Sequence, residues 1–415
     1  MSDLTNSKDS VTVIKNCRLC KSSNLQVVVN LGDQALTGVF PKSKSDDITS
    51  GPLRLVWCHE CSLLQLEHSY PLDEMYGANY GYRSGLNKIM VEHLSSKVSF
   101  LCQNVELETR DSVLDIGSND ATLLKAYKIE GIKRIGIDPT GKKFASHYSN
   151  DIKLIADFFS ADEFPNEKFK IITSISMFYD LENPQKFVSD IAQVLHKDGI
   201  WHFEQSYMPS MLRQNSYDTI CHEHLEYYAL TPVKKMLDAC DLKIIDVKMN
   251  SVNGGSFAIT ACHQNANFEA NNSVIQWMLE WEDKSKLNSP LPFLDFEKRI
   301  FDHRLSLQTL IHKINEEGKI IHCYGASTKG NVLLQFCGFN EDNISHVAEI
   351  NPDKFGCFTP GTSIPIISAE ESEKMSPDYY LVLPWHFRDG IIRNEKQFLE
   401  KGGRFIFPFP EIEIF

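Results

Sequence analysis

The chain has 415 residues, 42% of them hydrophobic and 23% charged, which excludes a disordered chain and predicts two or three folded domains. A net charge of −13 disfavours binding to nucleic acid or to an anionic membrane, although a few local donors could still hold a small anionic ligand. The sequence has no apolar run long enough to span a membrane and a polar start, MSDLTNSKDS, so we expect a cytoplasmic protein.

The first region of the chain carries two CxxC pairs among short strand-like stretches. One pair is Cys17 and Cys20, and the other is Cys58 and Cys61. Each pair presents two sulfurs from one tight turn, which suits a tetrahedral zinc ion. Because all four ligand positions are cysteines, no coordination position is left open for catalysis. We therefore predict a structural Zn2+ in a zinc-binding domain over residues 1–75.

Strands and helices alternate from about residue 112. The stretches SVLDIG, IKRIGIDP, IKLIADFF, FKIITSISMF and DGIWHFEQS are expected strands, and LKIIDVKMN and GGSFAITACH a closing pair. This alternation predicts a doubly wound, mainly parallel, Rossmann-like sheet, here assigned to residues 76–268. A charged helical region over about 271–318 and a second α/β pattern follow. They predict a smaller Rossmann-like domain over residues 269–415.

The first expected strand ends in Asp115 and turns at Gly117, where the backbone could approach a ligand at the carboxyl edge of the sheet. The turn is not a dinucleotide fingerprint, because Asn119 and Thr122 stand where G-x-G-x-x-G requires glycines. A pyrophosphate is therefore not the expected ligand.

Acidic residues also close the next two expected strands, Asp138 and Asp157. Carboxylates there suit a ligand rich in hydroxyl and amino donors, and S-adenosyl-L-methionine (SAM) is one without phosphate. The alternative is that these aspartates only cap turns. LDIGSND and GIDP resemble motifs I and II of class I SAM-dependent methyltransferases. The resemblance implies that Asp115, Gly117 and Asn119 line the methionine side, with Asp138 near the ribose and Asp157 near the adenine.

The segment YDTICHEHLEYYAL packs His222, Glu223, His224 and Glu226 among aromatic residues. The histidines lack the spacing of H-E-x-x-H, and no CxxC occurs after Cys61, so neither a metalloprotease nor a deaminase zinc site is expected. A buried structural cluster is the alternative. Since each group would then need a partner, we favour proton transfer, with a neighbouring carboxylate orienting an imidazole.

The order of motifs resembles that of nucleotide-sugar C-methyltransferases, over essentially the whole chain. The matching elements are the CxxC pairs, motif I, CHEHLEYY, NGGSF and YGASTKGN. The resemblance implies SAM in the middle domain and an NDP-4-keto-6-deoxy sugar held partly by the C-terminal domain. It implies that His224 removes the C-3 proton of the sugar, with Glu223 and His222 beside it. A base is required because methylation at carbon must first remove a proton next to a carbonyl.

The same resemblance implies further contacts to the sugar nucleotide. Tyr80, assigned to the catalytic group, and Tyr82 match tyrosines near the sugar, and Lys329 or the backbone around Gly325 and Gly330 match a diphosphate site. Packing glycines are the equally weighted alternative for that turn. Other expected substrate contacts are Tyr179, Asn253 and Asn331, and, less strongly, Trp385 and His386.

Two positions depart from the family pattern beside the expected sugar. Tyr179 and Asp180 stand where relatives tend to have a histidine, and Cys221 stands where they tend to have a tyrosine. The sugar or the methylated carbon can therefore differ. Three alternatives stay open: methyl transfer to oxygen or nitrogen, an NAD-dependent sugar oxidoreductase or epimerase, and a non-enzymatic zinc adaptor.

Overall fold

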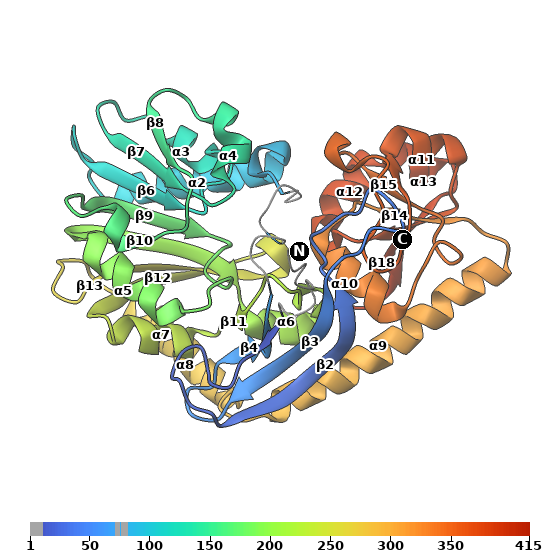
Figure 1. Cartoon of the computed structure of the whole chain (residues 1–415), viewed down its shortest axis with the longest axis horizontal. Helices are drawn as coiled ribbons and strands as arrows, with labels where there is room; N and C mark the ends of the chain where they lie inside the picture. The colour runs from blue at the N-terminus through green and yellow to red at the C-terminus, as the bar shows by residue number, and fades with distance from the viewer. Residues whose placement is uncertain (1–10, 71–74, 76–81) are drawn as a thin grey trace, which may run out of the picture.

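Four β-sheets organise the part of the chain that the computed structural model describes, which is residues 11–70, Met75 and residues 82–415 (Figure 1). A seven-stranded sheet forms one lobe and a six-stranded sheet the other, and strands from the N-terminal region lie between and below them. The expected α/β class is confirmed. Within the described ranges, no helix combines the length and the apolar character needed to cross a membrane.

The N-terminal strands form a four-stranded sheet and a separate two-stranded pair. The bounds are β1 (Thr12–Val13), β2 (Leu25–Ala35), β3 (Ser50–Cys58), β4 (Leu64–Leu66) and β5 (His68–Ser69), and β1 pairs with β5. The fourth strand of the larger sheet, β11 (Glu226–Tyr227), comes from much later in the chain and pairs antiparallel with β4. Because β11 follows His224 directly, the N-terminal sheet fixes one end of the H-E-H segment.

The seven-stranded sheet has the order β12-β13-β10-β9-β6-β7-β8. Its strands are β6 (Ser112–Ile116), β7 (Lys133–Ile137), β8 (Ile152–Ile155), β9 (Phe169–Ile175), β10 (Leu195–Ser206), β12 (Leu242–Asn250) and β13 (Ser256–His263). β6 to β10 run parallel, and β13 is antiparallel to both its neighbours. The chain runs outward from β6 to β8 and returns to β9, so the strand order reverses between β6 and β9. Ligands of such sheets bind at this reversal, beyond the carboxyl ends of the strands.

Helices cover both faces of this sheet because successive strand residues point to opposite sides. Val113 belongs to the apolar cluster that contains Leu94 of α2, whereas Leu114 belongs to the cluster that contains Ile191 of α5. The face of Val113 is covered by α2 (Lys88–Asn104) and α3 (Thr122–Ala126). The face of Leu114 is covered by α5 (Pro184–Val194), α7 (Leu230–Asp238) and α8 (Asn272–Lys284). Two short helices, α4 (Gly141–Phe144) and α6 (Met208–Gln214), lie in connections.

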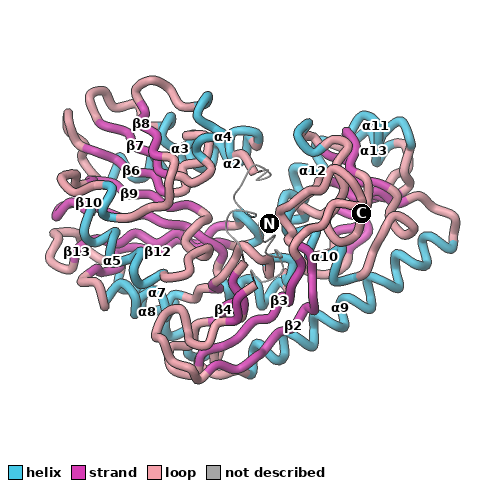
Figure 2. Tube along the Cα trace, in the orientation of Figure 1, coloured by secondary structure: helices cyan, strands magenta, loops and turns pink. Residues whose placement is uncertain are grey.

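The long helix α9 (Leu291–Glu316) runs beneath the N-terminal strands and on to the C-terminal lobe (Figure 2). It contacts β2 on its way and then α10. Its buried side chains, Phe293, Phe296, Ile300, Leu307 and Ile311, recur at helical spacing and form one apolar stripe. The expected helical region between the two α/β units is thereby confirmed.

The six-stranded sheet has the order β16-β15-β14-β17-β18-β19, with only β19 antiparallel to its neighbour. Its strands are β14 (Ile321–Tyr324), β15 (His346–Glu349), β16 (Ile366–Ser368), β17 (Tyr379–Val382), β18 (Arg404–Phe407) and β19 (Glu413–Ile414). Its helices are α10 (Thr328–Cys337), α11 (Ala369–Met375), α12 (Arg388–Asn394) and α13 (Lys396–Glu400). The order reverses between β14 and β17. The loops after these strands touch, since a Cβ added at Gly325 would lie 3.0 Å from Pro384.

Seven 3-10 helices lie in connections of the described chain. They are η1 (Ser84–Leu86), η2 (Ala145–His147), η3 (Ala161–Glu163), η4 (Tyr217–Thr219), η5 (Val252–Gly254), η6 (Pro352–Lys354) and η7 (Trp385–Phe387). Three of them lie close together, because η5 packs against η7 and Trp385 of η7 donates a hydrogen bond to Asp218 of η4.

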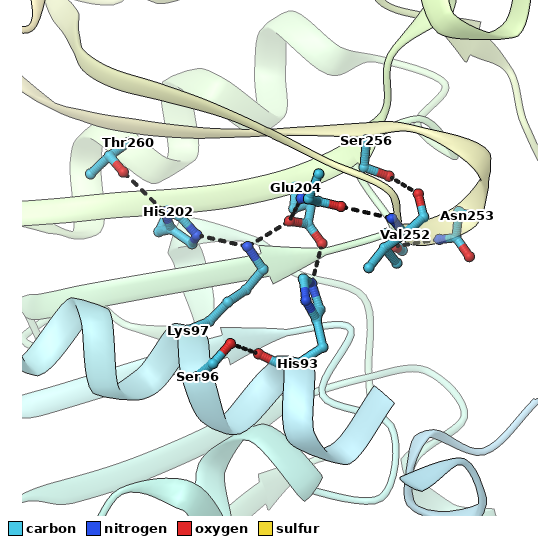
Figure 3. Close-up of polar contacts among 11 residues, drawn as sticks. His93, Ser96, Lys97, His202, Glu204, Val252, Asn253, Ser256 and Thr260 are labelled. Carbon is cyan, nitrogen blue, oxygen red and sulfur yellow. Dashed lines mark hydrogen bonds and ion pairs between the residues drawn. The ribbon is translucent and has the colours of Figure 1, made fainter. Parts of the chain in front are cut away.

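A polar cluster around Glu204 is buried between α2 and β10 (Figure 3). The Glu204 carboxylate accepts hydrogen bonds from Asn250 and lies 2.6 Å from His93 Nε2 and 2.5 Å from Lys97 Nζ. His202, two residues earlier on β10, lies 2.9 Å from Thr260 through its Nδ1. The cluster fastens α2 to the middle of the sheet and to the residue before the η5 loop.

Candidate active site

His224 lies between η4 and β11, beside the loop that follows β9. Its Nδ1 lies 2.9 Å from the carbonyl oxygen of Thr219 and, since a carbonyl can only accept, Nδ1 carries the proton and Nε2 keeps its lone pair. The ring centre lies 4.2 Å from that of Tyr179. Burial and the positive charge of Lys329 lower the pKa of His224 to about 3, so the imidazole is neutral near pH 7. This geometry leaves Nε2 available to accept a proton.

Glu223 does not orient the imidazole of His224. Its carboxylate lies against Gly38 of the N-terminal region, where an added Cβ would clash with Oε1. Burial raises the pKa of Glu223. The expectation that a carboxylate orients the histidine is therefore wrong, because the backbone carbonyl of Thr219 holds Nδ1 of His224 while the Glu223 carboxylate lies against Gly38.

His222 and Glu226 face the N-terminal region. The His222 ring is fully buried and packs edge-on against Tyr70, with ring centres 4.6 Å apart, and burial lowers its pKa to about 3. Glu226 is buried too, and one of its carboxylate oxygens lies 3.9 Å from Nε of Arg18. Of the four acid–base residues of the motif, His224 lies beside Tyr179, and the other three contact the N-terminal region.

The C-terminal lobe brings Lys329 to the same place. This second residue of α10 donates from Nζ to the carbonyl of Asn253 at 3.3 Å. The side-chain amide of Asn253 in turn donates to Ser176 Oγ, also at 3.3 Å. Nearby, the indole of Trp385 donates to Oδ2 of Asp218 at 2.8 Å. The segments that follow β14 and β17 therefore contact η5, which carries Asn253, and η4, which precedes His224.

Other predicted substrate residues lie apart from this group. Tyr80 lies outside the described residues. Tyr82 is 49% exposed, and its carbonyl accepts a hydrogen bond from Asn119, so it lies beside the turn after β6. Asn331 is fully buried and donates to the carbonyl of Thr37 at 2.8 Å, which joins α10 to the N-terminal region. Its predicted contact with substrate stays a prediction.

The expected cofactor turn forms at the carboxyl end of β6. Gly117 has φ of +72°, and a Cβ there would lie 3.0 Å from Met177 in the loop after β9. A glycine is thus required where the two loops of the strand reversal approach each other. Asp115 is buried and accepts a hydrogen bond from Thr173 at 2.6 Å, and burial raises its pKa to about 7.

The two later aspartates differ in their surroundings. Asp138 is buried, and its carboxylate accepts hydrogen bonds from the backbone NH of Asn119 at 2.8 Å and of Thr140 at 2.7 Å. It therefore fixes the shape of the turn after β6. Asp157 is exposed and accepts a hydrogen bond from the backbone NH of Phe158 at 2.7 Å. The predicted contacts of these carboxylates with ribose and adenine stay predictions.

The four cysteines of the CxxC pairs converge, with all sulfurs within 4.8 Å of one another. Cys17 and Cys61 sulfurs are 3.5 Å apart, as are those of Cys20 and Cys58. A tetrahedral zinc ion with Zn–S bonds near 2.3 Å would separate its sulfurs by about 3.8 Å, so this donor set fits zinc. Gln65 donates to the sulfur of Cys17 at 3.2 Å, which is the kind of outer contact that orients metal ligands.

Sequence reasoning did not find several residues that shape the site. Thr219 acts through its carbonyl and Gly38 through its lack of a side chain, so neither carries a chemical signature in the sequence. Asp218 lies inside the motif, but its partner Trp385 is far away in the chain, and only the fold joins them. The Cα faces of Gly325 and Gly330 are covered by Pro384 and Leu383, so both glycines have a packing role.

Family models match the chain in three consecutive parts. They are described as a zinc binding domain over residues 17–76, a methyltransferase domain over residues 86–247 and a C-methyltransferase C-terminal domain over residues 251–410. The C-methyltransferase NovU of Streptomyces niveus is 29% identical over 413 residues, which cover 97% of each chain.

Solved structures resemble part of the chain. Magnesium protoporphyrin IX methyltransferase from Synechocystis PCC 6803 with bound SAM is 14% identical, with a TM-score of 0.32, over 42% of this chain and 79% of that one. A SAM-dependent methyltransferase from Clostridium acetobutylicum is 13% identical, with a TM-score of 0.34, over 42% of this chain and 92% of that one.

The matches to the methyltransferase and zinc-binding family models agree with the turn at Gly117 and with the four-cysteine cluster. SAM supplies an electrophilic methyl group when bound, and zinc supplies a fixed crosslink between the two CxxC turns. The chain thus matches, in order, models of a zinc-binding domain, a methyltransferase domain and a C-methyltransferase C-terminal domain, and together with the similarity to NovU these matches support a SAM-dependent C-methyltransferase.

Proposed function

We propose that the protein methylates carbon C-3 of an NDP-4-keto-6-deoxy sugar, with His224 as the base. The observation that carries this proposal is Nε2 of His224, which has no hydrogen-bond partner among the described residues. The imidazole lies beside Tyr179, in the loop after β9 that also approaches the Gly117 turn. Methyl transfer to carbon requires a carbanion equivalent, which a neutral base can generate only next to a carbonyl group.

A sugar nucleotide suits the arrangement of the seven-stranded and six-stranded sheets. The strand reversal between β6 and β9 offers one ligand edge, where we place the methyl donor, and the reversal between β14 and β17 offers a second. His224 lies between them, with Lys329 and Trp385 from the C-terminal lobe on one side. We propose that the nucleotide occupies the C-terminal edge while the sugar reaches His224. Because both reactants would be held in a fixed orientation, the barrier to methyl transfer would be lowered.

Hydrogen exchange in D2O tests the base directly. The protein is incubated with a 4-keto-6-deoxy nucleotide sugar, with and without SAM, and followed by NMR and mass spectrometry. We expect deuterium at the carbon next to the ketone without SAM, and a new carbon-bound methyl group with SAM. His224→Gln should lower both rates by about 100-fold or more, because a positioned base contributes on that order.

His222→Gln serves as the matched control, since that ring is fully buried against Tyr70. It removes the same functional group two residues away and should preserve exchange in the folded protein. A methyl group found on oxygen or nitrogen would refute the proposed reaction. Full exchange by His224→Gln would refute the role of the base.

A further inference from the structure

Lys329 is a cation of the C-terminal lobe that faces the base of the middle region. It lies in the first turn of α10, which packs on η4 (Tyr217–Thr219) just before the H-E-H segment. Within the described ranges, its ammonium makes one hydrogen bond, to the carbonyl of Asn253 at 3.3 Å, and has no carboxylate within ion-pair distance. Since an ammonium has three donors, two remain for a ligand.

The groups around Lys329 do not neutralise it by direct contact. Oδ2 of Asp218 accepts from Trp385, and its Oδ1 is buried without a hydrogen bond from the described residues. Burial lowers the pKa of Lys329, while the nearby Asp218 and Cys221 act to raise it. A largely buried cation without a close counter-ion is costly in the free protein. Such an arrangement is favourable when an anion forms beside it.

The relation of Lys329 to His224 indicates where that anion forms. Lys329 lies on α10, which packs on η4, and the carbonyl of Thr219 in η4 accepts a hydrogen bond from Nδ1 of His224. The ammonium is therefore near the imidazole, whose pKa its charge helps to lower, and the two cations would repel each other once the imidazole had taken a proton. An enolate oxygen formed between them would offset that repulsion. A diphosphate bound far from the reacting carbon would do so less, since charge interactions weaken with distance.

We propose that the Lys329 ammonium binds the ketone oxygen of the substrate and stabilises the enolate that His224 creates; this inference rests on the proposed function. The C–H bond next to the ketone breaks, its proton goes to Nε2 of His224, and the electron pair spreads onto the oxygen held by Lys329. The enolate carbon then bonds to the SAM methyl group as the S–CH3 bond breaks. Its electron pair stays on sulfur, giving neutral S-adenosylhomocysteine, and the ketone is restored. His224 afterwards loses its proton to water.

This role differs from the diphosphate contact expected for Lys329 from the family pattern. A diphosphate ligand would act equally in the ground state and the transition state, so its loss would raise KM. An enolate ligand acts mainly in the transition state, so its loss would lower kcat. The two roles therefore separate in the kinetics of one variant.

The test measures SAM-independent deuterium exchange by Lys329→Met and Lys329→Arg at varied concentrations of the sugar nucleotide, together with the affinity for free nucleoside diphosphate. For Lys329→Met we expect kcat for exchange to fall about 100-fold or more, as when one donor to an oxyanion is removed. KM and the nucleoside diphosphate affinity should change by less than about threefold. Lys329→Arg keeps the charge and should recover part of kcat.

Lys354→Met is the control variant, because Lys354 also donates to a backbone carbonyl near this edge, that of Ala326 at 2.7 Å. A comparable loss of exchange in that variant would mean that the edge itself is disturbed, and would overturn the inference. A higher KM and weaker nucleoside diphosphate binding with unchanged kcat would assign Lys329 to the diphosphate instead. If the wild-type protein exchanges no hydrogen in any such sugar, the proposed function fails, and the inference with it.

Discussion

Glu204→Gln should destabilise the protein strongly, because it breaks a buried network. Burial alone would raise the pKa of Glu204, but the hydrogen bond from His93 and the charge of Lys97 outweigh it and lower the pKa from 4.5 to about 2. At 1.36 kcal/mol per pKa unit, this difference corresponds to about 3 kcal/mol. The variant also leaves the 8% exposed Lys97 without its partner, and breaking a buried ion pair from one side costs about 3–5 kcal/mol.

Urea unfolding at pH 7, followed by tryptophan fluorescence, should show this loss of about 3–5 kcal/mol as a lower midpoint for the variant. The folded-state pKa of Glu204 lies below its unfolded value, so its contribution is present above about pH 4.5 and disappears as the pH falls toward 2. The difference between variant and wild type should therefore shrink over that range.

Glu92→Gln is the matched control, on α2, the helix that carries Lys97. Glu92 is exposed and lies 3.8 Å from Lys88, and such surface pairs contribute between about 0 and 1 kcal/mol. Equal stability of Glu204→Gln and Glu92→Gln would refute the view that the network holds α2 onto β10. A difference that stayed constant down to pH 2 would refute its electrostatic origin.

Two further changes follow from the cofactor turn and the zinc cluster. Burial raises the pKa of Asp115 to about 7, so the folded state loses stability as the pH rises from the unfolded value near 3.8 toward 7. The side chain of Asp115→Asn cannot ionise, so the variant escapes this loss. Its unfolding free energy minus that of wild type, both without SAM, should rise by about 3 kcal/mol from pH 5 to pH 8. A difference that did not change with pH would contradict this. Cys58→Ser should lower zinc content, measured by mass spectrometry of the metal, and methyl transfer with it. Cys102→Ser should change neither, and full zinc content in Cys58→Ser would contradict the four-sulfur site.

Local patterns predicted much of the fold. The strands of both α/β units follow from short apolar runs between helical stretches, and the zinc cluster follows from the CxxC spacing, because each signal lies within a few residues. The turn at Gly117 was likewise predictable, since a glycine directly after an apolar strand indicates a turn with positive φ, which the structure shows there.

Contacts between distant segments could not be predicted in this way. Nothing near Asn331 in the sequence indicates that its amide bonds Thr37, and nothing near Glu223 indicates that its carboxylate meets Gly38. Asp138 could not be assigned a role from the sequence, because an aspartate at a strand end can bind either a ribose hydroxyl or the backbone NH groups of a turn. The pairing of β11 with β4 is a register between segments far apart, which hydrophobic pattern alone does not specify.

The pairing of β11 with β4 limits where the chain can be cut into separate parts. A protein that begins after the zinc-binding region would lack β4, so Glu226 and Tyr227 would lose their strand partner and the buried Tyr228 would lose part of its cover. An uncovered strand edge with aromatic neighbours is prone to self-association. Exchange of parts between related enzymes should therefore move the first two regions as a single unit and place the junction in α9 or beyond.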